Sequence, residues 1–288
     1  MRKTGGYIPE LEKREVSLCS ADIKGRKKLC SREKEMTAMR NYLKSLGKPI
    51  SEKAPDVVTA VMKHLEVETE ADIFYASKFR WFYGGLAADE SISKIFKPLG
   101  PKNNTNLLDN YNIDNSIRQW AENGEREFKK RIKHIPFQMI DFEECGTELS
   151  RLNVHSLIGT FDCFAVVFNT DVSTGRGKHW FCVYGDLQHK GDKSDPITLE
   201  YFNSSGLPPR PQCLVWLEKT RTTLLDKGLA CEIIYSTKNK QIQFSKTECG
   251  VWSLLYILSR LEGHPSDWLL RVNANDTDMI KYRKHLFR

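Results

Sequence analysis

The residue of this chain best suited to chemistry is Cys249. It stands with Gly250 where a polar, turn-like segment gives way to an apolar run that is typical of a helix. A cysteine at a helix N-terminus lies beside backbone N–H groups that lack helical partners, at the positive end of the helix dipole. Both features favour the thiolate, which is the reactive form of the side chain. The position therefore predicts a nucleophilic cysteine.

Three further residues have the types and positions that such a nucleophile needs. His179 ends a Gly-rich segment and precedes a strand-like run, so we expect it to be the base. Asn203 follows another strand-like run and precedes a turn, where its amide oxygen can accept from the imidazole, as in a Cys-His-Asn triad. Gln243 comes six residues before Cys249 and can donate to a developing oxyanion beside the Cys249 backbone N–H.

Taken singly, each of these residues has an ordinary structural explanation. A cysteine before glycine is often a small buried residue, and a histidine is often a hydrogen-bonded core residue. Asn203 is by type a turn former, and Gln243 alone is an exposed strand residue. The order of all four favours a cysteine peptidase. Trp180 and Asn169 are added as predicted cleft residues, although packing over the triad is the stronger expectation for Trp180.

The elements that must position these residues form a strand-rich region followed by helices. Short β-branched or aromatic runs bounded by Gly, Pro, Asn or Asp predict strands at 137–142, 161–168, 180–184, 197–202 and 231–235. Residues 185–196 between two of these strands are predicted to form a hairpin or surface loop. Helices are predicted at about 212–226, 249–262 and 275–287. This order is typical of an α+β fold.

The first 90 residues have a different pattern. Helical spacing predicts a helix over 31–46, a second helix with Asp56 as its N-cap, and an aromatic-rich third helix over 69–83. Residues 96–115 are loop-like, and a short helix follows around Ile117 and Trp120. We therefore expect a basic arm over 1–30, a helical domain over 31–90 and a catalytic domain over 91–288.

The positive charge is concentrated at the N-terminus. Residues 1–50 hold thirteen Lys/Arg and six Asp/Glu, which accounts for the whole formal net charge of +7. Such an arm can attract nucleic acid or an acidic partner. The alternative is a solvated, partly disordered tail, because the composition is equally typical of one.

Composition and motifs exclude several classes. No run approaches the roughly 20 apolar residues of a membrane span, and no secretory signal is present. The eight cysteines form no C-x-x-C pair or zinc-finger spacing, and we expect a reducing compartment without structural disulfides. No H-E-x-x-H or P-loop spacing occurs, so neither a metal nor a cofactor is predicted.

The order His-Trp, strand-Asn, Gln-x5-Cys-Gly resembles the SUMO-protease and adenovirus-protease superfamily of cysteine peptidases. Several longer stretches are similar to the polyprotein-processing protease of African swine fever virus. These are residues 100–114, 168–180, 199–206, 247–250 and 281–288. The resemblance covers residues 95–288, and over the first 90 residues it amounts to a helical domain of similar length.

This resemblance implies a papain-like, SUMO-protease-like α+β core with an N-terminal helical domain. It implies cleavage after Gly-Gly pairs in viral capsid or core-shell polyproteins during virion maturation, in the host cytoplasm and the virion core. By position, it makes Cys249 the nucleophile and His179 the base. Asn203 becomes the residue that orients the base, and Gln243 the oxyanion donor. Most SUMO proteases have Asp at the third position, and the viral enzyme has Asn.

Other functions remain open on the same residues. A peptidase that removes ubiquitin or a ubiquitin-like modifier would use the same triad, because diglycine recognition serves both activities. An acyltransferase on this fold would share the cysteine and the histidine, and its cofactor would distinguish it. An inert scaffold is disfavoured because all four catalytic-type residues are present.

Overall fold

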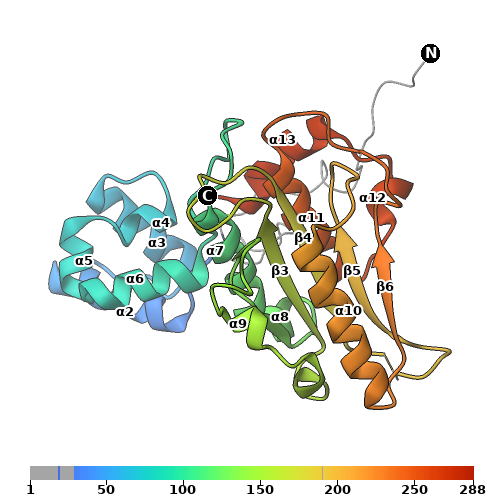
Figure 1. The fold of residues 1–288 in the computed structure, drawn as a ribbon. Coiled ribbons are helices and arrows are strands. Elements are labelled where there is room, and N and C mark those ends of the chain that lie inside the picture. The colour runs from blue at the N-terminus through green and yellow to red at the C-terminus, as the bar shows by residue number, and fades with distance from the viewer. Residues whose placement is uncertain (1–18, 20–28, 190) are drawn as a thin grey trace. The chain divides into compact units, whose positions relative to one another are not determined.

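The computed structural model describes residue 19 and residues 29–189 and 191–288 (Figure 1). The described chain forms two compact units. The helical unit contains the described residues up to Leu99 together with His285–Arg288, and the sheet unit contains Gly100–Lys284. Within the described ranges, every helix falls short of the length and apolarity that a bilayer crossing requires.

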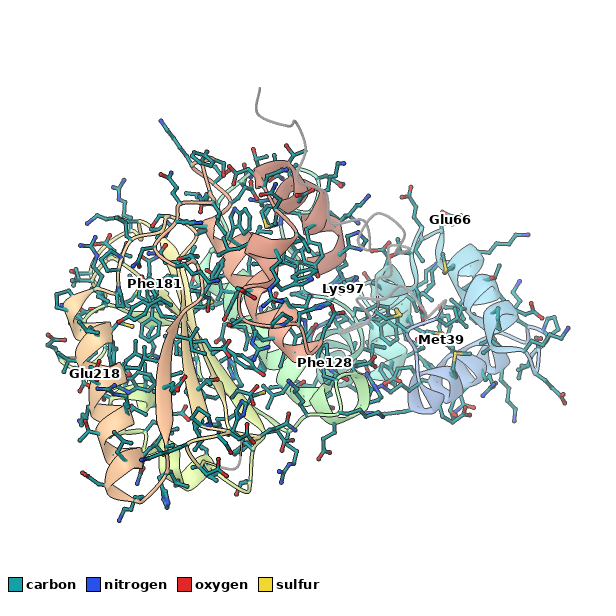
Figure 2. The ribbon with its side chains drawn as sticks, turned by 90° about the vertical axis from the view of Figure 1, so that its right-hand side faces the viewer. Met39, Glu66, Lys97, Phe128, Phe181 and Glu218 are labelled. Atoms are coloured by element: carbon teal, nitrogen blue, oxygen red, sulfur yellow. A yellow bond between two sulfur atoms is a disulfide. The ribbon has the colours of Figure 1, made fainter. Side chains whose placement is uncertain are left out.

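The described part of the helical unit contains five helices around its own core. They are α2 (Glu33–Ser45), α3 (Ala54–Leu65), α4 (Glu70–Ile73), α5 (Ser77–Tyr83) and α6 (Gly85–Ile95). In α2, Met36, Met39 and Leu43 recur at helical spacing and are buried, as their pattern predicts. Met39 is fully buried and is labelled in Figure 2.

Three details of the helical unit differ from the sequence predictions. The helix predicted over 69–83 is two helices, because residues 74–76 do not continue α4. The N-cap of α3 is Lys53, and Asp56 lies in the first turn after a proline. The helix α6 was not predicted. It begins at Gly85, directly after Gly84.

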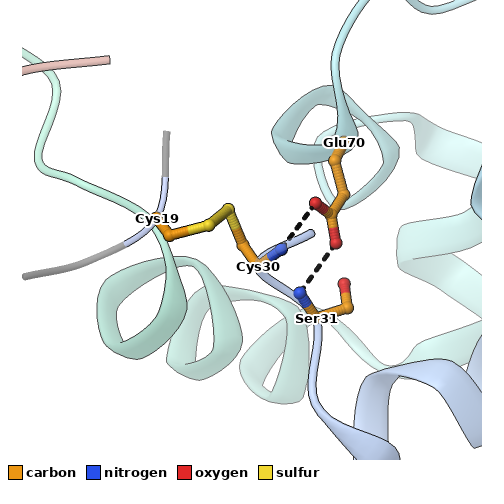
Figure 3. Close-up of a disulfide and its surroundings, with 4 residues drawn as sticks. All are labelled: Cys19, Cys30, Ser31 and Glu70. Atoms are coloured by element: carbon orange, nitrogen blue, oxygen red, sulfur yellow. Dashed lines mark hydrogen bonds between the residues drawn. A yellow bond between two sulfur atoms is a disulfide. The ribbon is translucent and has the colours of Figure 1, made fainter. Parts of the chain in front are cut away.

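Cys19 and Cys30 form a disulfide in the helical unit, with their Cα atoms 4.9 Å apart (Figure 3). The carboxylate of Glu70 accepts hydrogen bonds from the backbone N–H groups of Cys30 (2.8 Å) and Ser31 (2.7 Å). The expectation that the chain has no structural disulfide is therefore wrong for this pair. It rested on the predicted reducing compartment, and the folded chain brings these two cysteines within bonding distance. The other described cysteines are free.

The sheet unit is built on one mixed sheet. Its strands are β1 (Ile132–His134), β2 (Gln138–Met139), β3 (Cys163–Asn169), β4 (Trp180–Asp186), β5 (Ile197–Phe202) and β6 (Cys231–Tyr235). Their order is β1-β3-β4-β5-β6, with β2 also paired to β3. β3, β4 and β5 are antiparallel neighbours, whereas β6 is parallel to β5 and β1 and β2 are parallel to β3. The predictions for β3 to β6 are confirmed, but the strand predicted over 137–142 is only β2, and β1 was missed.

Helices cover both faces of this sheet. The described helices of the sheet unit are α7 (Asn110–Glu122), α8 (Gly124–Glu127), α9 (Glu148–Arg151), η1 (Val154–Leu157), α10 (Pro211–Asp226), α11 (Cys249–Leu261), α12 (Trp268–Arg271) and α13 (Asp276–Leu286). On one face, Trp216 of α10 packs against Phe164, and the fully buried Phe181 belongs to the same core (Figure 2). On the other face, Tyr256 of α11 stacks on Phe202 at 4.4 Å. Alternate residues of a strand point to opposite faces, so α10 and α11 lie on opposite sides.

Candidate active site

Cys249 is the first residue of α11, the most deeply buried helix of the sheet unit. Every residue of α11 except Arg260 is buried, so the apolar run fixes the helix against β4. Cys249 itself is 2% exposed. Backbone N–H groups of Trp180, Gly250 and Cys249 interact with its thiol. The start of α11 thus gives the sulfur the N–H groups that the sequence predicted.

A cavity of about 380 Å³ opens beside the thiol. Its walls come from the segment before α7, from the region around β2, and from the loop between β3 and β4. The lining residues are Leu107, Leu108, Asp109, Asn110, Phe137, Met139, Asn169, Ser173, Gly175, Arg176, Gly177, Lys178, Trp180 and Cys249. The two predicted cleft residues, Trp180 and Asn169, are both in this lining.

Trp180 is fixed by two contacts. Its indole Nε1–H donates to the Leu108 carbonyl at 3.0 Å, and its ring packs edge-on against Phe137. The side chain joins two walls of the cavity, and its backbone N–H reaches the Cys249 thiol. The indole thus packs in the wall of the cavity, and its position over the triad stays a prediction.

His179 lies next to Asn203, and the neighbours of the amide fix the tautomer of the imidazole. His179 Nε2 is 2.8 Å from Asn203 Oδ1. The same Oδ1 accepts from the Ser205 backbone N–H, while Nδ2 donates to the Leu207 carbonyl and the Tyr201 hydroxyl. A backbone N–H can only donate and a carbonyl can only accept, so the amide has one orientation. Nε2 of His179 therefore carries the hydrogen, and Nδ1 carries the lone pair.

Gln243 is connected to this pair through Ser204. The Ser204 hydroxyl donates to Gln243 Oε1 at 2.6 Å, and the Gln243 backbone N–H donates to the Ser204 carbonyl at 3.0 Å. Gln243 Nε2 donates to the Ser245 carbonyl at 2.8 Å, which uses one of its two N–H groups. The side chain is 6% exposed, so the alternative of an exposed strand residue is wrong.

Burial decides the charge states of the two central residues. Burial raises the pKa of the Cys249 thiol, and it outweighs the opposing backbone N–H groups of Trp180 and Gly250. Burial also lowers the pKa of His179, and the hydrogen bond to Asn203 offsets this only in part. Both shifts favour the uncharged forms of the thiol and the imidazole. The sequence shows the helix start, whose N–H groups favour the thiolate, but not the depth of burial, which opposes it.

The loop between β3 and β4 is organised by a residue that the sequence analysis missed. Asp171 accepts from the Gly177 backbone N–H at 3.2 Å and from Lys178 Nζ at 2.9 Å. Asn169 Oδ1 accepts from the backbone N–H groups of Asp171 and Lys178, both at 3.0 Å. The Asn169 oxygen therefore holds the loop rather than facing the cavity unpaired. An acidic residue inside a Gly-rich turn was the available signal.

Gly177 is required by the same loop. Its φ of 86° lies in the left-handed region, and a Cβ there would come within 3.0 Å of the Asn169 amide nitrogen.

In the described part of the chain, no cluster of three or more His, Cys, Asp or Glu side chains is arranged to hold a metal ion.

Comparisons with known proteins identify a family and a matching fold for this chain. No family model matches the chain. The SUMO-1 cysteine protease of the Pretoriuskop isolate of African swine fever virus is 34% identical to this chain over 218 residues. The match covers 71% of this chain and 76% of that protein. The cysteine protease of the Badajoz strain matches equally. The crystal structure of the pS273R protease of this virus superposes with a TM-score of 0.73 at 26% identity, covering 96% of this chain and 97% of that one. The resemblance and the α+β peptidase fold are confirmed.

Proposed function

We propose a mechanism and a substrate class for this chain from its family. The chain belongs to the family of the African swine fever virus SUMO-1 cysteine protease and is a cysteine protease. We infer that it is a viral endopeptidase that cleaves structural polyproteins after Gly-Gly pairs during virion maturation. The observations that support this proposal are the Cys249 thiol on the lining of a cavity in the sheet unit and the His179 imidazole held by Asn203. Its substrates are proteins, as for any protease.

In the first step, Cys249 Sγ attacks the carbonyl carbon of the scissile bond while His179 Nδ1 takes the thiol proton. The S–C bond forms, and the carbonyl electron pair moves to the oxygen. The imidazolium then gives its proton to the departing amine as the C–N bond breaks, which leaves a thioester. Water attacks the thioester with His179 again as the base, and the free thiol is restored.

Asn203 orients the base in this scheme. Its oxygen holds the Nε2–H of His179, so that Nδ1 is the nitrogen that faces the reaction. The neutral resting pair supports proton transfer during the attack rather than before it. Burial favours the uncharged forms of both groups until the substrate arrives.

Gln243 and the start of α11 provide the oxyanion donors. The second N–H of Gln243 Nε2 and the backbone N–H of Cys249 are the proposed pair. This proposal is supported by the hydrogen bonds that hold Gln243 from both sides, to Ser204 and Ser245. A donor that is held before the reaction needs no reorganisation when charge develops.

The lining of the cavity supports a substrate with small residues at the cleavage site. Bulky Trp180 and the loop closed by Gly177 both border the cavity that contains Cys249. A residue without a Cβ passes such a boundary more easily than any other.

Action in the host cytoplasm and in the virion core is proposed from the family alone. The nucleic-acid or acidic partner of residues 1–50 is proposed from charge, and residues 1–18 and 20–28 lie outside the described residues.

The second candidate is a peptidase that removes a ubiquitin-like modifier. The word SUMO in the name of the relatives favours it, and the proposed catalytic residues would serve it unchanged. The two functions differ only in the protein that carries the diglycine.

One experiment tests both functions. Candidate virion polyproteins and modifier-fluorophore conjugates are incubated with the wild type and with Cys249→Ala, and the products are identified by mass spectrometry. Cleavage after Gly-Gly of polyproteins alone supports the endopeptidase. Release of fluorophore without polyprotein cleavage would replace it with the modifier-removing activity.

A further inference from the structure

The helix α13 holds the segment that carries the proposed oxyanion donor and leads to the nucleophile. We call residues 243–248 the nucleophile loop. Asp276, the first residue of α13, accepts from the backbone N–H groups of Phe244 and Ser245, both at 2.7 Å. Its other oxygen accepts from the indole N–H of Trp252 in α11 at 2.9 Å. One carboxylate thus joins the nucleophile loop to the helix of the nucleophile.

A second contact from α13 reaches the residue before the nucleophile. Arg283 and Glu248 form a two-pronged ion pair, with Nε–Oε2 at 2.9 Å and Nη2–Oε1 at 3.0 Å. Both residues are fully buried, at 0% exposure. A guanidinium holds a carboxylate in a fixed geometry when it binds through two parallel hydrogen bonds. Glu248 is the N-cap residue of α11, so this geometry is imposed directly before Cys249.

Arg283 also holds a wall of the cavity. Its Nη1 donates to the Asn106 carbonyl at 2.8 Å, and the next two residues, Leu107 and Leu108, line the cavity. The same guanidinium therefore connects the nucleophile loop to the segment opposite it. Both α11 and α13 are labelled in Figure 1.

We infer that α13 is a positioning element for catalysis, in which Asp276 sets the oxyanion donor and Arg283 sets the nucleophile and the cavity wall. The inference rests on the proposed roles of Cys249 and Gln243. Neither residue touches the reacting atoms, so both act through the residues that they hold.

Asp276 acts through a short chain of contacts. It fixes the backbone of Ser245, and the Ser245 carbonyl accepts from Gln243 Nε2. The Gln243 amide keeps its direction only while Ser245 keeps its place. A carboxylate is acceptor-only, whereas an asparagine has one amide oxygen, which cannot accept both from the two N–H groups at Oδ2 and from the Trp252 N–H at Oδ1.

Arg283 acts through charge as well as geometry. The negative charge of Glu248 raises the pKa of the Cys249 thiol, and Arg283 neutralises that charge. The charged groups on the cavity lining are Asp109, Arg176 and Lys178, and the titratable His179 stands in the sequence between two lining residues, Lys178 and Trp180. Without Arg283, a buried carboxylate would stand unpaired beside a sulfur that has to become negative.

The first test separates the oxyanion donor from the thiol. Asp276→Asn is compared with wild type for short-peptide kcat, for inhibition by a Gly-Gly aldehyde peptide, and for alkylation of Cys249 by iodoacetamide. We expect kcat and aldehyde affinity to fall roughly tenfold or more, towards the 10²–10³ range of a lost oxyanion donor. We expect the alkylation rate to stay unchanged, because alkylation forms no oxyanion. Gln243→Ala sets the upper limit of the effect.

The second test separates charge from geometry at Arg283. In Arg283→Met, alkylation of Cys249 should require a higher pH than in wild type. The double variant Glu248→Gln/Arg283→Met removes both charges and should return the alkylation profile towards wild type. Arg283→Lys keeps the charge but loses the two-pronged bond, so its alkylation profile should stay near wild type while KM rises. Arg271→Met, which breaks the exposed pair with Asp267, is the matched control and should change neither quantity.

The outcomes distinguish this inference from the proposed function. If folded Asp276→Asn and Arg283→Met lower only the melting temperature, at unchanged aldehyde affinity and alkylation profile, α13 is merely structural and the inference is wrong. If Cys249→Ala itself cleaves peptides, the proposed function fails first. If Arg283→Met does not fold, the double variant and Arg283→Lys still decide between charge and geometry.

Discussion

The imidazole Nε2–H of His179 donates to Oδ1 of Asn203 over 2.8 Å. Because Ser205 and Leu207 fix the orientation of the Asn203 amide, the hydrogen bond has one direction and Nδ1 is left with the lone pair that the proposed base needs. A triad in which the third member is an amide has no carboxylate to stabilise the imidazolium. Burial lowers the pKa of His179, and the hydrogen bond to Asn203 offsets this only in part.

The exchange Asn203→Asp should therefore have a defined intermediate effect. Its carboxylate can still accept from Nε2, but its second oxygen would face the Leu207 carbonyl, which now accepts at 3.3 Å. We expect Asn203→Ala to lower kcat by about 10²–10⁴, the range for general acid–base catalysis, and Asn203→Asp to lower it less. The acid limb of the kcat/KM profile should move to higher pH in the Asp variant, since a carboxylate raises the pKa of the imidazole. An Asp variant as inactive as Ala, with an unmoved acid limb, would show that Asn203 does not orient the base.

Cys249→Ser and His179→Ala should each abolish peptide cleavage without unfolding the protein. Loss of one member of a catalytic unit can cost as much as loss of the whole unit. Activity is followed with a Gly-Gly peptide and folding by thermal unfolding. Cys145→Ser, which replaces an exposed free cysteine, is the control and should be fully active. Turnover by folded Cys249→Ser within about tenfold of wild type, far smaller than such losses, would end the assignment of the nucleophile.

The pH dependence should show the uncharged resting pair. His179 must be neutral to act as the base, and burial lowers its pKa, so activity should persist below the ordinary histidine pKa of about 6.5. Burial raises the pKa of the Cys249 thiol, so alkylation of the free enzyme should increase only above the ordinary thiol range of about 8.5. The measurements are kcat/KM and the iodoacetamide rate as functions of pH. Rapid alkylation that persists at pH 5 would instead indicate a thiolate–imidazolium pair.

The sequence predicted the parts of the fold whose signal is local. The strands β3 to β6 are continuous apolar or β-branched runs, and α11 is an apolar run that begins at a Cys-Gly pair. The catalytic order could be predicted because His179, Asn203 and Cys249 each stand at the boundary of such a run. Boundaries were less certain where an element is short, as in the two-residue β2.

The rest depends on contacts between residues that are distant in the sequence. No local pattern marks Arg283 as the partner of Glu248, because the pairing exists only once α13 folds against the nucleophile loop. The raised pKa of the Cys249 thiol follows from burial among several elements, whereas a helix start alone indicates a lowered pKa. The Cys19–Cys30 disulfide likewise has no motif, and compartment reasoning excluded it incorrectly.

The basic N-terminal region offers the last prediction. Lys24, Arg26, Lys27 and Lys28 all stand in the sequence between Cys19 and Cys30, the two cysteines of the disulfide. Replacing these four residues with Gln should weaken binding to DNA at low salt and leave short-peptide kcat unchanged, since every proposed catalytic residue lies beyond residue 178. Each lost phosphate contact should reduce the slope of log affinity against log salt by about 0.9.

The matched control is Lys63→Gln/Lys78→Gln, which removes two exposed charges from α3 and α5. Fluorescence anisotropy with a labelled duplex at several salt concentrations gives the affinities. Equal DNA affinity in both variants and wild type would favour the solvated-tail alternative for this region. An arm that only locates the substrate cannot affect the cleavage of a small uncharged peptide when its charge is removed. If the four-residue variant stays folded but loses short-peptide turnover, the region therefore belongs to the active-site architecture.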